Sequence, residues 1–171
     1  CIEKTRDRIE VSPHTYLEKN WVPIFDMPYH FVKWTNGTEV VKYDIHTCQT
    51  TQVALTDWRD LGCIDLRGGS QVIPFGDNGD RICVTHETHF FWHQNKKKDA
   101  QYYHRFIIWD KDWNLEKWTS DFNFLGSQID PTTGHEYNIE FATGMIFHEG
   151  NIIIAGLFTS CIPLKAPRTT A

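Results

Sequence analysis

Two glutamates lie where apolar segments of the chain begin, and paired carboxyl groups are what the cleavage of a glycosidic bond requires. Glu18 precedes segment 20–25, and Glu140 lies at the start of segment 139–144. One carboxyl group would protonate the leaving oxygen, while the other would serve as base or nucleophile. A structural carboxylate held by hydrogen bonds is the alternative for each residue. Glu18 and Glu140 are therefore the candidate catalytic residues.

Several further side chains have the chemistry of sugar or phosphate binding. Arg67 and Arg105 could hold an anion such as a sugar phosphate through paired N–H donors, although an arginine paired with a carboxylate is the more frequent arrangement. Trp21, directly after Asn20, could stack its ring on the C–H face of a sugar while polar groups set the orientation. We count Asn20, Trp21, Arg67 and Arg105 as candidate substrate-binding residues.

The histidines of segment 86–104 raise the question of a metal site. His86 and His89 are three residues apart, so a strand would point their rings to opposite faces, which is unsuitable for shared ligation. The five cysteines are odd in number and widely spaced, and none forms a Cys-x-x-Cys pair. We therefore expect reduced thiols, no metal and no cofactor.

The elements that must position these residues are predicted to be β-strands, because apolar residues recur with a period of two. Hairpins are expected where turn sequences separate such segments: 29–35 and 39–45, 71–75 and 81–88, 102–110 and 115–120, and 139–147 and 151–158. Asn36-Gly37 and Glu149-Gly150 would form two of the tips. Asn36-Gly37-Thr38 also fits a glycosylation acceptor, but the hairpin turn is the preferred interpretation. No segment is predicted to be helical, so the expected fold class is all-β.

Composition limits the possible functions. The chain has 171 residues, of which 40% are hydrophobic and 14% aromatic, and this suits one globular domain with a sizeable core. Its net charge of −5 lacks the basic excess that binding to nucleic acid requires. Its apolar runs fall far short of the ~20 residues that span a bilayer. We expect neither a nucleic-acid nor a membrane partner and, with reduced cysteines, a cytoplasmic location.

The strand pairs recur in units near residues 17–60, 66–122 and 137–161. Two units place an inset proline, Pro23 or Pro74, in their first apolar strand, where an edge position tolerates it. Recurrence every 40 to 70 residues or so is typical of propeller blades with insertions. The predicted architecture is a β-propeller-like series of antiparallel meanders in one domain, residues 1–171, with a β-sandwich as the alternative.

Four motifs follow one another in an informative order. They are residues 18–23 (EKNWVP), 67–74 (RGGSQVIP) with Thr85-His86-Glu87, 103–106 (YHRF) and 139–144 (IEFATG). Together they resemble the five-bladed β-propeller domains related to the β-mannoside phosphorylases and hydrolases, and similar domains occur beside glycosyltransferase domains. The resemblance runs over about residues 17 to 160. It implies about three of five blades, so we expect the remaining blades to lie in sequence outside this segment or in a partner.

The resemblance also implies roles for individual residues. His86 matches a histidine that helps to hold phosphate in the phosphorylases, but Glu87 replaces the glycine that usually follows it. A carboxylate at this position would repel phosphate and would suit a sugar hydroxyl or water better. The acidic motif that carries the family's proton donor has no match in this chain. We add His86 and Glu87 to the substrate-binding residues and expect little catalysis by this chain alone.

Two functions therefore remain open. The first is a carbohydrate-active propeller, similar to the glycoside hydrolases and phosphorylases, that binds a glycan or a sugar phosphate at the mouth of its channel. The second is a non-catalytic carbohydrate-recognition or scaffold module associated with a glycosyltransferase. The missing proton-donor motif favours the second, whereas the arginines, His86 and the carboxylates favour the first. The expected partners are a saccharide or sugar phosphate, further propeller blades and a glycosyltransferase domain.

Overall fold

The computed structural model describes residues 20–34, 37–56, 66–92, 98–125, 128–129, 136–137 and 140–158, and within these ranges every regular element is a β-strand. A first sheet contains, in this order, β1 (Val22–Pro23), β2 (His30–Trp34), β3 (Thr38–Asp44) and β4 (Gln49–Thr56). A second sheet has the order β5 (Arg67–Gly68), β7 (Asp80–Trp92), β8 (Lys98–Trp109) and β9 (Leu115–Trp118), with β6 (Ile73–Phe75) also paired to β7. The remaining pairs are β10 (Gln128–Ile129) with β11 (Glu136–Tyr137), and β12 (Glu140–His148) with β13 (Asn151–Phe158).

The strand ladders are all antiparallel, which confirms the predicted all-β, antiparallel class. Trp34 pairs with Thr38 at the first predicted hairpin, although Asn36 of its turn lies outside the described residues. His148 pairs with Asn151, and the two tip residues Glu149 and Gly150 both have positive φ, as a tight two-residue turn requires. Each sheet has an open strand order, and none of those in the described ranges closes on itself.

The second sheet is packed on both faces, because apolar residues of opposite parity on β7 and β8 face different neighbours. Cys83, Ile107 and Trp109 share a buried cluster with Val32 and Val40 of the first sheet. Ile82, Phe106 and Ile108 lie on the other face and share a cluster with Met145 and Ile154 of the β12–β13 hairpin. The first sheet, the second sheet and the β12–β13 hairpin therefore form successive layers in chain order.

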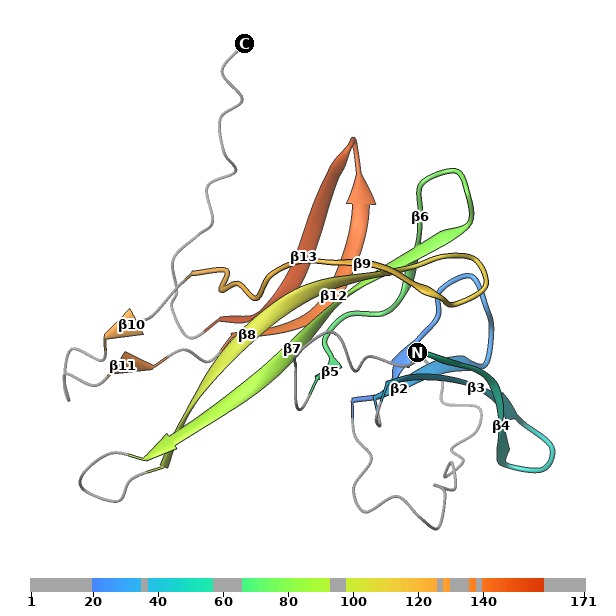
Figure 1. Cartoon of the computed structure of the whole chain (residues 1–171), viewed down its shortest axis with the longest axis horizontal. Coiled ribbons are helices and arrows are strands. Elements are labelled where there is room, and N and C mark those ends of the chain that lie inside the picture. Colours follow the sequence, from blue (N-terminus) through green and yellow to red (C-terminus); the bar gives the residue numbers. More distant parts are fainter. Residues whose placement is uncertain are drawn as a thin grey trace, which may run out of the picture.

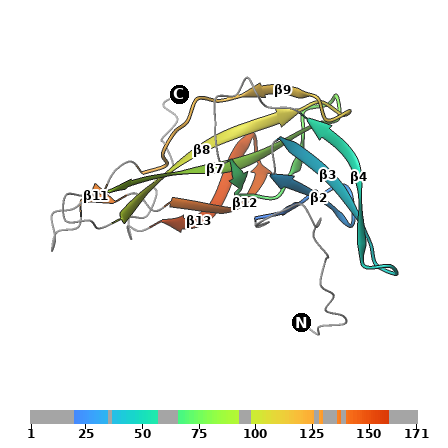
Figure 2. The same cartoon turned by 60° about the horizontal axis from the view of Figure 1, so that its bottom comes forward.

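Figure 1 shows β7 and β8 as a long ribbon that crosses the molecule, with β2–β4 and the β12–β13 hairpin as separate sheets. Figure 2 gives a second view, in which β4 and the short β11 again lie at opposite ends. The ring of Trp34 on β2 lies 6.1 Å from that of Trp109 on β8, so these tryptophans join two sheets. None of the described segments forms a helix with the length and apolar character needed to cross a membrane.

Two close approaches join the sheets, one at Gly68 of β5 and one at Gln71 just after it. A Cβ added to Gly68 would lie 2.4 Å from the backbone oxygen of Asn20 and 2.3 Å from Cγ1 of Val22, so only glycine fits there. The Gln71 amide reaches β12, where Nε2 donates to the Met145 oxygen at 2.7 Å and Oε1 accepts from the Met145 N–H at 3.3 Å. The Gln71 side chain therefore bonds to the backbone of β12 as a neighbouring strand would, and it links the second sheet to the third.

Candidate functional site

The predicted site residues on β7 and β8 separate onto the two faces of the central sheet. His86 lies opposite His104 in the register and shares its face, which is the one turned to β12–β13. Glu87 and Arg105 belong to the other face, because side chains alternate along a strand. His89 lies on the Glu87 side, so the structure also separates it from His86. The candidate residues of these strands therefore do not surround one site.

The carboxylate of Glu140 is bound by the backbone of the segment after β9. Its Oε2 accepts from the Phe124 N–H at 2.6 Å and its Oε1 from the Leu125 N–H at 2.8 Å, and the residue is 2% exposed. Charge-assisted hydrogen bonds of this length satisfy N–H groups that would otherwise be costly to bury. Of the two interpretations that the sequence left open for Glu140, this geometry suits the structural carboxylate.

His104 lies beside Glu140 in the same buried region. Its Nδ1 is 3.9 Å from Glu140 Oε2, and its ring lies 4.6 Å from that of Phe124. Burial lowers the pKa of His104 to about 4, although the nearby Phe122 backbone has a smaller opposing effect. The imidazole is consequently neutral at physiological pH.

Two of the predicted substrate-binding residues, His86 and Arg67, lie at the edge of the same region. His86 is buried, with its ring 4.5 Å from that of Phe141 on β12 and 5.9 Å from that of Tyr102. Arg67 on β5 is paired with His86 in the register and so lies beside it in the sheet. Arg67, His86 and Glu140 are therefore brought to one side of the central sheet, where aromatic packing rather than open space surrounds His86.

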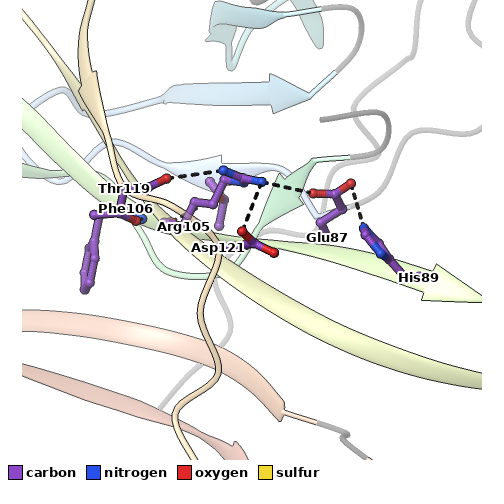
Figure 3. A network of polar contacts seen from close by, with 7 residues as sticks. Glu87, His89, Arg105, Phe106, Thr119 and Asp121 are labelled. Atoms are coloured by element: carbon purple, nitrogen blue, oxygen red, sulfur yellow. Dashed lines mark hydrogen bonds and ion pairs between the residues drawn. The ribbon is translucent and has the colours of Figure 1, made fainter. Parts of the chain in front are cut away.

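Glu87 and Arg105 take part in a polar network on the opposite face (Figure 3). Arg105 Nη2 lies 3.9 Å from Glu87 Oε2 and 3.7 Å from Asp121 Oδ1, and Nη1 donates to the Thr119 oxygen at 3.3 Å. His89 Nε2 lies 2.9 Å from the other oxygen of Glu87. Arg105 is thus paired with carboxylates, which is the arrangement that the sequence analysis gave as the more frequent one. The network links β7 and β8 to the chain after β9.

An open cleft of about 580 Å³ lies elsewhere, between the β1–β2 turn, the segment 69–71 and Thr143 of β12. Its aromatic lining includes Trp21, Phe25, Tyr29 and Phe31, and among the described residues none of the lining side chains is an Asp, Glu, Lys or Arg. The Trp21 ring lies 6.3 Å from that of Phe31, and Lys33 Nζ lies 5.1 Å from the Trp21 ring centroid. Lys33 is itself paired with Glu39 at 3.2 Å, so its ammonium charge is balanced outside the cleft lining.

The β1–β2 turn holds two aromatic side chains out toward solvent. Phe25 is 75% exposed and Tyr29 56% exposed. Tyr29 has a φ of 62°, a left-handed conformation that is costly for a bulky residue and is found where the surroundings enforce it. Hydrogen bonds from Tyr43 N–H to the Tyr29 oxygen and from His30 N–H to the Met27 oxygen hold the turn. The rim of the cleft is therefore a fixed feature of this sheet.

Trp21 is the predicted site residue that lines the cleft, and Asn20 precedes it with a φ of 62°. Glu18 lies outside the described residues. Sequence reasoning missed Tyr29, Phe31 and Thr143, although four aromatic residues between positions 21 and 31 were a usable signal for the first two. Within the described parts of the chain, no three His, Cys, Asp or Glu side chains are grouped closely enough to hold a metal ion.

Comparison with known proteins adds no relative: no family model, no curated protein and no solved structure matches this chain.

Proposed function

We propose that this chain is a carbohydrate-binding module that holds a neutral saccharide in the cleft beside Trp21 and does not cleave it. The observation that carries the proposal is the composition of the cleft, whose described lining combines four aromatic side chains with no Asp, Glu, Lys or Arg. Aromatic faces bind the C–H surface of sugars, whereas a sugar phosphate calls for cationic donors. A neutral ligand therefore fits this lining better than a phosphorylated one.

Polar groups for orienting a sugar are also at hand. Thr143 Oγ1 donates to the Ala155 oxygen at 3.3 Å, which leaves its own lone pairs to accept from a sugar hydroxyl. The exposed side chain of Tyr29 adds a phenolic hydroxyl at the rim. A few polar groups among aromatic ones is the usual composition of a small-molecule site.

The proposal favours binding over the alternative, glycoside hydrolysis or phosphorolysis, because of the state of the candidate acid. Both oxygens of Glu140 are occupied by backbone N–H groups in a buried position. A general acid must reach the leaving oxygen of its substrate within hydrogen-bond distance. None of the described residues that line the cleft supplies such a carboxylate, and Glu18 lies outside the described part of the chain.

The architecture we propose is part of a β-propeller. Three antiparallel sheets packed face to face in chain order support it, because this is how neighbouring blades meet. Association with a glycosyltransferase domain and a cytoplasmic location complete the proposal. The free thiols of Cys48 and Cys83 support a reducing compartment.

Calorimetric titration of the chain with neutral manno-oligosaccharides and with mannose 1-phosphate tests the proposal. We expect measurable binding of the neutral oligosaccharide, no tighter binding of the phosphate, and no cleavage products. Trp21→Ala should weaken binding about tenfold, since one stacked aromatic ring contributes on the order of 1 kcal/mol. Trp118→Ala is the matched control, because Trp118 is an exposed tryptophan outside the cleft and should leave binding unchanged.

Unchanged affinity in a Trp21→Ala, Tyr29→Gly double variant would overturn the cleft assignment. Turnover of the oligosaccharide that disappears in Glu140→Gln, at unchanged stability, would instead restore the hydrolase hypothesis.

A further inference from the structure

The segment around the β1–β2 turn supplies most of the lining of the cleft, and one of its residues makes a different contact. Of residues 21–31, all line the cleft except Asp26. The Asp26 carboxylate bonds instead to Arg81 of β7, whose Nη2 donates to Oδ2 at 3.0 Å. Phe25 and Met27, on either side of Asp26, both line the cleft. The Asp26–Arg81 ion pair therefore joins the rim of the cleft to the second sheet.

The Arg81 side chain is itself held in place by the turn between β8 and β9. Its Nη1 donates to the Lys111 oxygen at 3.3 Å, and its guanidinium carbon lies 4.9 Å from the centroid of the Trp113 ring. Trp113 belongs to the buried cluster that joins the first and second sheets. The planar guanidinium is thus fixed before it meets Asp26, so little side-chain freedom is lost when the ion pair forms.

Backbone contacts join the base of the β1–β2 turn to the segment before β6. The Phe25 N–H donates to the Val72 oxygen at 2.9 Å, and the Val72 N–H donates to the Pro23 oxygen at 3.0 Å. The Phe25 side chain beyond this base is largely exposed, so packing contributes little to its position. The two backbone bonds leave the tip of the turn able to pivot, and the Asp26–Arg81 pair restrains that motion.

We propose that Arg81 is a positioning residue for the cleft: through Asp26 it sets the angle at which the β1–β2 turn presents Phe25 and Tyr29 to a ligand. The inference rests on the proposed saccharide binding. Arg81 does not line the cleft, so its effect on affinity is indirect. Without the ion pair the rim would be in its binding geometry for only part of the time, and the apparent dissociation constant would rise in inverse proportion to that fraction.

Calorimetric titration of a double-mutant cycle with neutral manno-oligosaccharides tests the proposal. Asp26→Ala and Arg81→Met each remove one partner of the ion pair. We expect each change to weaken binding about three- to fivefold, and the double variant to bind no more weakly than Arg81→Met, because both changes break the same contact. Arg81→Lys keeps the positive charge and should recover part of the loss.

Asp121→Ala is the matched control, because Asp121 is also an aspartate that faces a largely buried arginine. Its Oδ1 lies 3.7 Å from Arg105 Nη2, and its side chain is 46% exposed against 35% for Asp26. Asp121 does not line the cleft, so its removal should leave the affinity unchanged. Equal losses of affinity in the Asp26 and Asp121 variants would refute the positioning role, and so would losses that add up in the cycle.

Hydrogen exchange separates this inference from the proposed function, since it needs no saccharide. The Phe25 and Val72 N–H groups, which join the turn to the segment before β6, should exchange faster in Asp26→Ala than in the native chain. Unchanged exchange of these two amides would refute the restraint on the turn. A native chain that binds no saccharide would instead overturn the proposed function, and the exchange of the two amides would then decide by itself whether Arg81 restrains the turn.

Discussion

The buried region around Glu140 and the open cleft around Trp21 differ in which side chains meet solvent. The first contains the titratable groups typical of catalysis, a glutamate and two histidines, but they are held by backbone N–H groups or covered by aromatic rings. The second is accessible and aromatic, and none of its lining side chains is an acid. Within the described residues, the buried region therefore holds the titratable groups, whereas the accessible cleft is lined by aromatic side chains and by no acid.

The two regions therefore have different structural roles. The buried carboxylate joins the third sheet to the chain that follows the second, since Glu140 is on β12 and its partners Phe124 and Leu125 follow β9. The cleft is built on the first sheet and uses the third only through Thr143. One region holds sheets together, and the other presents a surface.

The sharpest test of this contrast is Glu140→Ala. The change removes two charge-assisted hydrogen bonds from the Phe124 and Leu125 N–H groups to a buried carboxylate, so we expect the free energy of unfolding to fall by about 3 to 5 kcal/mol. Urea denaturation followed by tryptophan fluorescence measures the loss. Glu149→Ala, at an exposed turn, should change stability by no more than about 0.5 kcal/mol. Equal stability of the Glu140 variant and the native chain would contradict the structural role.

The second test uses pH, through His104. Its pKa is lowered to about 4 in the fold, against about 6.5 in the unfolded chain, so the neutral form is favoured by folding. The resulting stability is complete above pH 6.5 and is lost as the pH falls toward 4, by about 3 kcal/mol at pH 4. The urea midpoint should decline over this window in the native chain. His104→Phe should remove that part of the decline, and an identical pH profile in the variant would show that His104 is not buried as described.

The third test concerns the close contact between Gly68 of β5 and the first sheet, beside the cleft. Gly68→Ala would bring a methyl group within 2.4 Å of the Asn20 backbone oxygen, so we expect a loss of about 2 to 3 kcal/mol and a distorted cleft wall. Gly144→Ala is the control, because its nearest neighbours would lie at 3.7 and 3.8 Å, an ordinary contact distance. Thermal unfolding of both variants compares them directly. Equal melting temperatures would show that the two sheets are not in close contact at Gly68.

The smallest expected effect, and the one with opposite sign, is at the rim of the cleft. Tyr29→Gly relieves a positive φ at an exposed position, so the free energy of unfolding should rise by about 0.5 kcal/mol even though the ring is lost. Saccharide affinity should fall in the same variant. A gain in stability with a loss of binding separates the functional surface from the folding core, whereas a loss of stability would mean that the Tyr29 ring supports the turn.

Local sequence chemistry predicted much of the fold. Glu149-Gly150 formed the expected tip, and Pro23 and Pro74 lie in the short strands β1 and β6, as an inset proline requires. β4 was missed, because its sequence QTTQVALT is half polar and has no turn signal of its own. β7 extends to Trp92, beyond the segment expected from alternation.

The site was less predictable, because its physics is not local. The partners of Glu140 are backbone groups 15 and 16 residues away. Every residue type except proline has a backbone N–H, so the sequence does not indicate which N–H groups will bond to the carboxylate. The sequence analysis placed His86 and Glu87 in one substrate-binding set, although strand alternation alone requires adjacent residues to face opposite ways. The sheet that each face would meet depended on how the layers pack.

The Gln71 amide has a consequence for the order in which the chain folds. Each meander closes loops of a few residues, and hairpins of this kind form within microseconds. The bonds between Gln71 and Met145 join positions 74 residues apart, so the entropy of closing that loop must be met before they contribute. We therefore expect the β12–β13 hairpin to dock late in folding. Interactions that form after the rate-limiting barrier change the rate of unfolding rather than the rate of folding. If the hairpin docks after that barrier, the Gln71 side chain slows detachment of the third sheet and does not speed folding.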